Sequence, residues 1–407
     1  MLEYSWPVSR TIEVDWRQEN RSGGREDRLV RRIQASVPAE ISNEQPFFSA
    51  SLMAKAERAC LLAVQLDAAA GIQLGSLSSL LLRAESAASS KIEGLAASPS
   101  DFARAAYGSK GNATAVEMVD GAKALRWFVD EAKPGVRLNL EQILKTHQIL
   151  FASESSSDVQ AGQLRTVQNW IQGSNYSPIG ATYVPPPPEL VPDLMQDLIA
   201  FSNRDDLPVL VQAAVVHAQF ENIHPFVDGN GRIGRALVSV ILRRRGVSKM
   251  VTIPLAAALG ANREQYFESL SQWRLGNAQP IIELFVTGIA AASLEAATTA
   301  DVIETLPKLW QERLGRASTA NLASKALAFL SNQPIFNAND LAETLGVPLT
   351  SAYPAISKLE AADIIRPLTD RTRNQIWGAH EILEELEHLE LRIGARMSQT
   401  NRPSELP

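Results

Sequence analysis

The chain has 407 residues, of which 45% are hydrophobic and 21% charged, a balance that is typical of globular proteins and excludes a disordered or fibrous chain. Its formal net charge of −6 argues against a protein that coats nucleic acid non-specifically. The single cysteine, Cys60, excludes an internal disulfide and a cysteine-based zinc site, and it is typical of a reducing compartment.

The N-terminal region, residues 1 to about 45, is polar, and the charged stretch RQENRSGGREDR (17–28) predicts an exposed loop. The first fifteen residues contain charged side chains and no apolar segment, so no signal peptide is apparent. The most membrane-like run, residues 281–297, is short and contains two glutamates, which indicates a core helix. We therefore expect a cytoplasmic protein with no membrane segment.

The middle of the chain, from about residue 46 to 300, has apolar residues three and four positions apart within alanine- and leucine-rich stretches, which predicts a mainly helical region. The exception is NWIQGSNYSPIGATYVPPPP (169–188), where Gly, Asn, Ser and four successive prolines exclude a helix. Within it, ATYVP (181–185) predicts an extended strand or one arm of a hairpin.

The residue pattern changes after about residue 300. The pattern predicts two short helices joined by a turn at Gly346 (338–345 and 350–359), two short strands around the polar tip TDRTRN (364–368 and 375–377), and a last helix (381–397). Helix, turn, helix and two-stranded wing is the order of a winged-helix module.

Two kinds of role stay open for this module: DNA binding, and protein–protein contact or support of a homodimer. Four Lys and Arg residues stand against five Asp and Glu residues between Asn337 and His380, whereas a DNA reader usually shows a basic face. Pro354 fits poorly with a long recognition helix. Arg371 and Arg373 at the tip of the wing leave DNA contact open.

The stretch IHPFVDGNGRIGR (223–235) joins two predicted core helices, each with one apolar stripe (Val209, Ala213, Val216, Phe220 and Ile223 before it; Ile233, Leu237, Val240 and Ile241 after it). Gly229, Asn230 and Gly231 can turn several backbone N–H groups inward at the start of a helix. Such a nest binds anions, because the amides and the helix dipole both point at the ligand.

Four side chains of this loop suit phosphoryl or nucleotidyl transfer. Arg232 and Arg235 lie three positions apart, on roughly one face of the first turn, where they can clamp phosphates. Asp228 can hold a magnesium ion, which prefers carboxylate and phosphate oxygens. His224 is a candidate general base for a hydroxyl that attacks phosphorus.

Two other nucleotide-binding signatures are excluded. Residues 229–234 match the dinucleotide fingerprint G-x-G-x-x-G, but a helical pattern precedes them and no Asp or Glu occurs between Arg235 and Glu264. The phosphate-binding P-loop is excluded because no lysine follows a glycine at the required spacing.

The residues HPFVDGNGRIGR resemble the active-site motif of the Fic (filamentation induced by cAMP) family, His-Pro-Phe-x-Asp/Glu-Gly-Asn-Gly-Arg-x-x-Arg, with every fixed position present. The segments GQLR (162–165) and GATYVP (180–185) resemble the region that leads into the family's flap hairpin, which docks target segments by strand pairing. The resemblance covers roughly residues 75 to 290. It implies transfer of AMP from ATP to a hydroxyl side chain of a protein.

The resemblance also implies a role for each residue of the loop. His224 would deprotonate the target hydroxyl, and Asp228 would bind Mg²⁺ at the α- and β-phosphates. The remaining roles are the anion nest (Gly229, Asn230, Gly231), the β-phosphate (Arg232), the γ-phosphate (Arg235), the adenine pocket (Asn262, Tyr266) and the target-docking flap (Thr182, Tyr183, Val184).

A second motif, SSKIEG, resembles the family's inhibitory motif, Ser/Thr-x-x-x-Glu-Gly/Asn, with Ser89, Glu93 and Gly94 at its fixed positions. It follows a helical stripe, and Gly94 is a plausible helix stop. The resemblance implies that Glu93 competes with the γ-phosphate of ATP for Arg235 and so inhibits the enzyme.

We therefore predict a mainly α-helical protein with an N-terminal helical region that carries the inhibitory motif (1–115), a Fic core with a short β-hairpin flap (116–300), and a winged-helix domain with a C-terminal helix (301–407). The predicted function is autoinhibited protein adenylylation, with ATP and Mg²⁺ as cofactors and a Ser, Thr or Tyr hydroxyl of a protein, this chain included, as acceptor. The alternatives are a nucleotide-sensing, DNA-binding regulator with little turnover, or a Fic enzyme that removes AMP or transfers another nucleotide or phosphoryl group.

His147 and His217 are interpreted as packing or surface residues, and Arg243, Arg244 and Arg245 as a helix C-cap.

Overall fold

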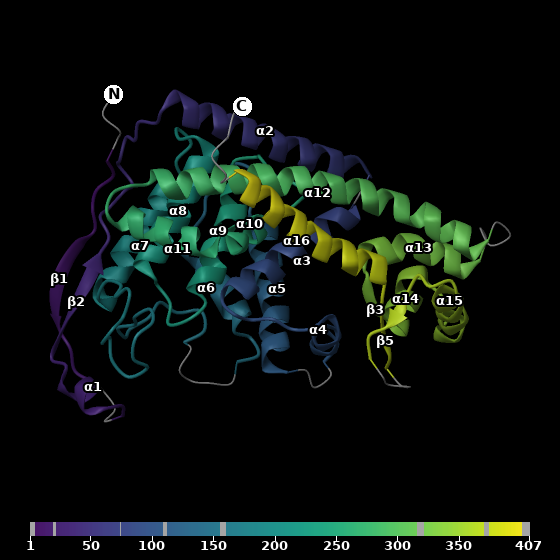
Figure 1. Cartoon of the computed structure of the whole chain (residues 1–407). Coiled ribbons are helices and arrows are strands. Elements are labelled where there is room, and N and C mark those ends of the chain that lie inside the picture. Colours follow the sequence, from purple (N-terminus) through teal and green to yellow (C-terminus); the bar gives the residue numbers. More distant parts are fainter. Residues whose placement is uncertain are drawn as a thin grey trace. The chain divides into compact units, whose positions relative to one another are not determined.

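The computed structural model describes residues 5–18, 22–73, 75–108, 112–154, 160–315, 321–369 and 374–400. It is mostly helical, as predicted, with two small antiparallel sheets among these residues (Figure 1). The chain folds into two compact units, each assembled from separate segments of sequence. The first contains 1–58, 123–246 and 263–286; the second contains 59–122, 247–262 and 287–407.

The first unit is built around helix α8 (Val209–Ile223). Every residue of α8 from Leu210 onward is buried, polar side chains included, so the helix lies within the core of this unit. Helices α7, α9 and α11 pack against it. The helices of this unit that the structure describes in full are α6 (Leu140–Leu150), α7 (Val191–Ser202), α9 (Asn230–Arg244) and α11 (Arg263–Arg274), with α1 (Arg25–Leu29) and the 3-10 turn η1 (Pro188–Leu190).

The packing of α8 against α9 depends on Gly234. A Cβ atom at this position would lie 2.7 Å from Oε1 of Glu221 and 3.1 Å from Cδ1 of Phe220, both on α8. A larger residue would displace these side chains, so α8 and α9 approach each other closely at a glycine.

The N-terminal region contains strands that the sequence analysis did not predict. Strand β1 (Arg10–Asp15) pairs antiparallel with β2 (Arg32–Val37) in a register that joins Arg10 to Val37 and Asp15 to Arg32. Three alternate residues of β2 are buried, namely Ile33, Ala35 and Val37. Gln34 and Ser36 alternate with them, so β2 has the period of two of a half-buried strand, but the many charged residues before it led to the interpretation of the region as polar and loop-like.

The second unit contains the predicted C-terminal elements, α14 (Ala338–Leu345), α15 (Leu349–Ala361), β4 (Arg366–Pro367), β5 (Ile376–Gly378) and α16 (His380–Thr400). Gly346 ends α14 with a φ of 62°, the left-handed conformation expected of the turn. A further strand, β3 (Ile335–Asn337), completes a sheet of order β3-β5-β4. Arg371 and Arg373 lie outside the described residues, and the assignment of a winged helix stays a prediction.

Pro354 lies inside α15 and does not end it, because α15 continues to Ala361. The remaining helices of this unit are α3 (Gly75–Ile92), α4 (Pro99–Ala106), α10 (Leu255–Ala261) and α13 (Leu322–Asn332). Three helices contain residues of both units, α2 (Ala50–Gln73), α5 (Ala113–Glu131) and α12 (Gln279–Leu314).

Helix α12 contains the run that the sequence analysis interpreted as a core helix. Within the described residues it is the one helix long and apolar enough to cross a membrane by length and composition. In its most apolar window, 67% of the residues are buried within the protein. This burial is what a core helix shows.

Candidate active site

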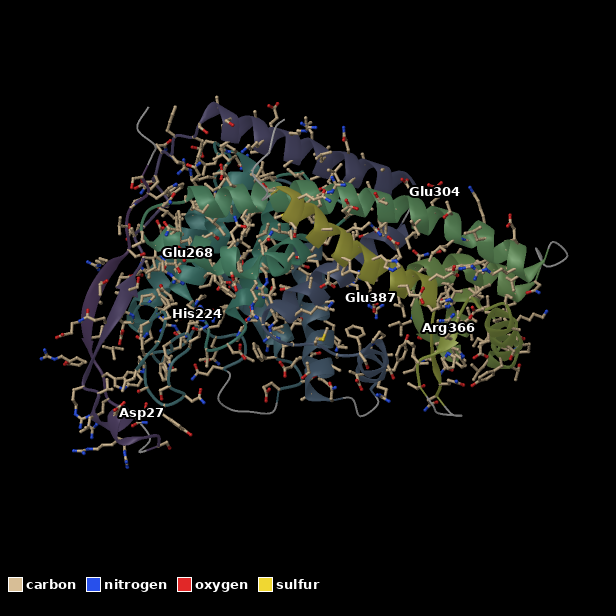
Figure 2. The ribbon with its side chains drawn as sticks, in the orientation of Figure 1. Asp27, His224, Glu268, Glu304, Arg366 and Glu387 are labelled. Carbon is tan, nitrogen blue, oxygen red and sulfur yellow. The ribbon has the colours of Figure 1, made fainter. Side chains whose placement is uncertain are left out.

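The backbone of His224 adopts an uncommon conformation directly after α8. Its φ and ψ are 50° and 61°, in the left-handed region, and its N–H donates to the carbonyl oxygen of Phe220 at 2.9 Å. A residue with a Cβ occupies this region only when its surroundings hold it there. The turn ends α8 abruptly, and His224 is labelled in Figure 2.

Arg165 holds this turn in place. Its Nε donates to the carbonyl oxygen of His224 at 2.9 Å, its Nη1 to Val167 at 3.1 Å and its Nη2 to Pro186 at 2.5 Å. Its own backbone N–H donates to the carbonyl oxygen of Pro225 at 2.9 Å. Burial lowers the pKa of Arg165 to about 10, so the guanidinium stays charged at neutral pH. From its sequence, Arg165 was expected only to lie near the flap, and no local pattern indicates this role.

Asn230 closes the loop on itself. Its Oδ1 accepts the N–H of Phe226 at 2.9 Å, and its Nδ2 donates to the carbonyl oxygen of Phe226 at 2.8 Å. The side chain is therefore fully engaged within the loop and 2% exposed. Asn230 can contribute to an anion nest through its backbone, not through its side chain.

Gly229 starts α9 and is required there for two reasons. Its φ of 78° lies in the left-handed region, and a Cβ atom would approach Leu150 and Phe151 to 2.8 Å. Glycine also provides no side-chain acceptor at the N-cap. The N–H groups of the first turn of α9, at residues 230–232, therefore have no acceptor within the helix and are available to an anion.

His147, on α6, contacts the backbone of the loop at Asp228. Its Nδ1 accepts the N–H of Gly162 at 2.9 Å, which places the ring proton on Nε2, and Nε2 lies 3.1 Å from the carbonyl oxygen of Asp228. The ring stacks on Phe226 with centroids 3.9 Å apart. Burial lowers the pKa of His147 to about 4, so the ring is neutral at physiological pH. Of the two interpretations in the sequence analysis, packing is correct and a surface position is wrong.

The charged side chains of the loop differ in exposure. The side chain of Asp228 is 63% exposed, whereas that of Arg232 is 7% exposed, and their closest oxygen and nitrogen are 3.9 Å apart. Nε and Nη1 of Arg232 are buried without a hydrogen-bond partner among the residues that the structure describes. Buried donors of this kind fit a phosphate, which would supply the missing acceptors. Arg235 is 2% exposed.

The donor set fits magnesium carried by a nucleotide. Across the described ranges, no group of three or more His, Cys, Asp or Glu residues is arranged to hold a metal ion. Magnesium commonly binds one or two carboxylates together with substrate phosphates and water, rather than an all-protein cage. A single exposed carboxylate, Asp228, next to the N-terminus of α9 satisfies that requirement.

Glu221 lies beside the candidate base and was not identified from the sequence. Its Oε2 is 3.9 Å from Nδ1 of His224, and its side chain is 9% exposed. A buried carboxylate at this distance favours the protonated imidazole. The signal in the sequence was an acidic residue three positions before the histidine, on a helix with no other charged carboxylate.

The flap segment is anchored more firmly than its sequence suggests. Ile171 and Tyr183 form an isolated antiparallel bridge, and the hydroxyl of the buried Tyr183 donates to Asn222. The carbonyl oxygen of Val184 accepts the N–H of Ser36 on β2 at 2.9 Å. Thr182 is the exposed residue of the three. Their role in docking a target stays a prediction.

The two residues assigned to an adenine pocket belong to different units. Asn262 ends α10 in the second unit. Tyr266, in the first unit, is 1% exposed, and its hydroxyl lies 2.8 Å from Nε2 of His217. His217 is 0% exposed and is thus a packing residue. The adenine-pocket roles stay predictions.

The inhibitory motif ends α3 in the second unit. Ser89 is buried within α3, and Glu93 follows its last residue, Ile92. Gly94 has a φ of 80°, and the N–H groups of Glu93 and Leu95 both donate to the carbonyl oxygen of Ser90, at 3.1 and 3.0 Å. Gly94 is therefore a helix stop, as predicted.

Comparison with known proteins agrees with this geometry. Residues 137–242 match the model of the Fic/DOC family. Over 161 residues the chain is 26% identical to "Protein adenylyltransferase fic-1" of Caenorhabditis elegans, which covers 39% of this chain and 28% of that protein. Over 94 residues it is 36% identical to a probable protein adenylyltransferase of Aquifex aeolicus, which covers 23% of this chain and 27% of that protein.

The fold is also similar to that of a solved Fic family structure. The structure of a Fic family protein from Desulfovibrio desulfuricans G20 superposes with a TM-score of 0.54 at 19% identity, covering 83% of this chain and 98% of that one. The protein contains a Fic/DOC-family domain. The match covers little more than a quarter of the length of each of these two relatives.

Proposed function

We propose that this protein is a protein adenylyltransferase, which transfers AMP from ATP to a Ser, Thr or Tyr hydroxyl of a protein. One observation carries the proposal: the 224–235 loop combines a histidine in a fixed left-handed turn, an exposed carboxylate and the open N-terminus of α9 with a buried arginine. The names of the relatives support the same activity.

The phosphates of ATP would lie at the first turn of α9. The N–H groups at residues 230–232 would receive phosphate oxygens, and Arg232 would offer its buried Nε and Nη1 to the β-phosphate. Asp228 would hold Mg²⁺, which when bound would neutralise negative charge on the phosphates. Arg235 would hold the γ-phosphate.

His224 would supply the base. The target hydroxyl would give its proton to the imidazole, its oxygen would form a bond to the α-phosphorus, and the bond from that phosphorus to the bridging oxygen would break. Pyrophosphate would leave with the electron pair, and the imidazolium would return its proton to solvent. The carboxylate of Glu221, 3.9 Å from Nδ1, would stabilise the imidazolium.

The proposal includes inhibition by Glu93. A carboxylate that pairs with Arg235 would deny the γ-phosphate its clamp, so ATP would bind with its α-phosphorus out of line with the attacking oxygen. Such transfers depend mainly on positioning, and a small misplacement costs about 10²-fold in rate. The wild-type protein would then be nearly inactive.

Parallel incubations with ATP labelled at the α- or the γ-phosphate test the proposal, with the Glu93→Gly variant as the enzyme source and bacterial lysate as the source of acceptors. Protein-bound label from the α- but not the γ-position is expected. Label from the γ-position would indicate phosphoryl transfer instead. ATP binding in the micromolar range without protein labelling by any variant would contradict adenylylation and favour the nucleotide sensor.

A further inference from the structure

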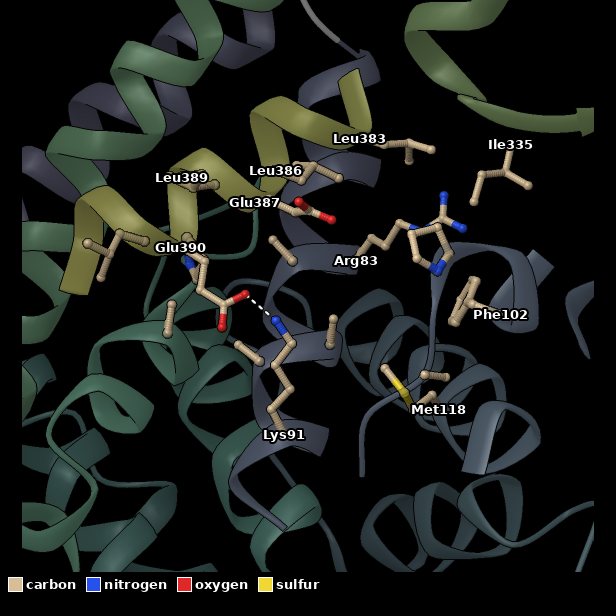
Figure 3. Close-up of a pocket in the computed structure, with 18 residues that line it drawn as sticks. Arg83, Lys91, Phe102, Met118, Ile335, Leu383, Leu386, Glu387, Leu389 and Glu390 are labelled. Carbon is tan, nitrogen blue, oxygen red and sulfur yellow. Dashed lines mark hydrogen bonds and ion pairs between the residues drawn. The ribbon is translucent and has the colours of Figure 1, made fainter. Parts of the chain in front are cut away.

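The second unit contains a pocket between α3 and α16 that the proposed chemistry does not use. Its volume is about 160 Å³, and all its lining residues belong to the second unit (Figure 3). An apolar cavity of about 150 Å³ holds a benzene-sized molecule. The pocket therefore has room for the side chain of a leucine or a phenylalanine.

The hollow arises from a difference in side-chain size across two helices. The face of α3 toward the pocket carries three alanines, Ala84, Ala87 and Ala88, one helical turn apart or adjacent. The opposite wall is made by larger apolar side chains of α16, Leu386, Leu389 and Ile393, with Met118 and Phe102 at the side (Figure 3). Short side chains on one helix leave space that the longer ones on the other do not fill.

The rim of this pocket is charged and electrically balanced. Helix α3 contributes two cations, Arg83 and Lys91, and α16 contributes two anions, Glu387 and Glu390. Nζ of Lys91 lies 2.6 Å from Oε2 of Glu390, and the two side chains are 47% and 37% exposed. Figure 3 shows this ion pair spanning the pocket from one helix to the other. Water screens such an exposed pair, so a ligand can replace it at little cost.

We propose that this pocket binds a small zwitterion with an apolar side chain, such as an apolar amino acid. The side chain would fill the hollow over the α3 alanines. The carboxylate would replace Glu390 as the partner of Lys91, and the ammonium group would replace Lys91 as the partner of Glu390. A ligand with only one charged group would satisfy one member of the pair and leave the other without a partner, so the balanced rim favours the zwitterion.

Binding is tested by isothermal titration of the full chain with L-leucine and with L-phenylalanine. The controls are glycine, which has no side chain, 4-methylpentanoate, which has no amine, and 3-methylbutylamine, which has no carboxylate. We expect a dissociation constant at or below about 1 mM for at least one of the two amino acids, and binding at least about tenfold weaker for each control. No binding of either amino acid, or equal binding of a control, would overturn the proposed ligand class.

Ala87→Leu places a leucine side chain in the hollow without weakening the helix, because leucine is a good helix former. It should abolish binding. The matched control is Ala395→Leu, on an exposed position of α16 outside the pocket, which should bind as the wild type does. Glu390→Gln should weaken binding several-fold. The melting temperature of each variant without ligand checks that it folds. Undiminished binding by a folded Ala87→Leu protein, or by an Ala84→Leu protein if the first does not fold, would refute the site.

The consequence for activity rests on the proposed function. Lys91 lies two residues before Glu93, so a ligand inserted between Lys91 and Glu390 would shift the end of α3 that carries the inhibitory glutamate. The ligand should raise AMP transfer by the wild type and leave Glu93→Gly unchanged. An unchanged wild-type rate at saturating ligand, with Glu93→Gly active, would overturn this regulation. If no variant transfers AMP while titration still detects binding, adenylylation fails and the binding site stands.

Discussion

Nε of Arg165 donates a hydrogen bond of 2.9 Å to the carbonyl oxygen of His224, and the two residues are 59 positions apart in the sequence. The bond ties a buried guanidinium to the one residue between α8 and α9 that would act as a base. Because the left-handed backbone of His224 is costly on its own, we infer that Arg165 is a positioning residue.

Replacing Arg165 with lysine keeps the positive charge but loses the planar guanidinium, whose three nitrogens donate to three carbonyl oxygens. We expect the rate constant for AMP transfer to fall about 10²-fold while the dissociation constant of ATP stays nearly unchanged, because the base is misplaced and the phosphate site is not. Single-turnover kinetics in the Glu93→Gly background, together with ATP titration, measure both.

Arg204→Lys is the matched control. Nη1 of Arg204 donates to the carbonyl oxygens of Ser42 and Glu44, away from the loop. This variant should transfer AMP at close to the parental rate. A purely structural Arg165 would be indicated by equal losses in both variants, or by a loss of ATP affinity that matches the loss of rate.

His224→Ala should lower the rate of transfer by about 10²–10⁴, the usual cost of removing a general base, and leave ATP binding largely intact. Label transfer from α-labelled ATP and a binding titration measure the two properties on the same protein. Near-normal transfer by this variant would show that another group takes the proton.

Asp228→Ala should remove the magnesium dependence of transfer together with the activity, since no other carboxylate lies within the 224–235 loop. The measurement is the transfer rate against magnesium concentration. Asp228→Asn is the conservative companion, because it keeps the size of the side chain and removes the charge. Should either variant retain the wild-type magnesium titration, the ion is held elsewhere.

Glu93→Gly should raise self-modification strongly, because under the proposed inhibition it would free Arg235 and leave the loop untouched. The double variant Glu93→Gly with Arg235→Ala should lose that gain, since the freed partner is then missing. Label incorporation from α-labelled ATP is compared among the wild type, both single variants and the double variant. A rate that Glu93→Gly leaves unchanged or lowers would make Glu93 an ordinary residue of the turn.

His147 predicts a pH dependence of stability. Its pKa is about 4 in the folded protein and 6.5 as an ordinary histidine, so between these values the unfolded chain binds a proton that the folded chain does not. The free energy of unfolding should therefore fall as the pH falls from 6.5 to 4, by about 3 kcal/mol from this residue at most. Urea unfolding of the wild type and of His147→Gln over this pH range measures this change. The variant should be less stable at pH 7, and its free energy of unfolding should fall less steeply as the pH falls. If the free energy of unfolding changes equally with pH in both proteins, other titratable groups cause the pH dependence.

Much of the candidate site could be predicted from the sequence because its chemical groups are contiguous. The histidine, the acid, the glycines and the arginines occupy residues 224–235, and their spacing alone indicates an anion site at the start of a helix. Helix periodicity likewise located the core stripes of α8 and α9 and the short helices α14 and α15, because a regular helix repeats its buried positions locally.

Only the tertiary structure showed what holds the loop in shape. Arg165 and His147 bond to backbone oxygens 59 and 81 positions away, and no local pattern indicates such partners. The same holds for the pairing of β1 with β2, two short strands in a mainly polar region. It also holds for the pocket between α3 and α16, which exists because small side chains of one helix meet large ones of another. The sequence by itself determined which chemical groups the loop presents, since these are local; their geometry depends on contacts between distant segments, which the folded chain alone decides.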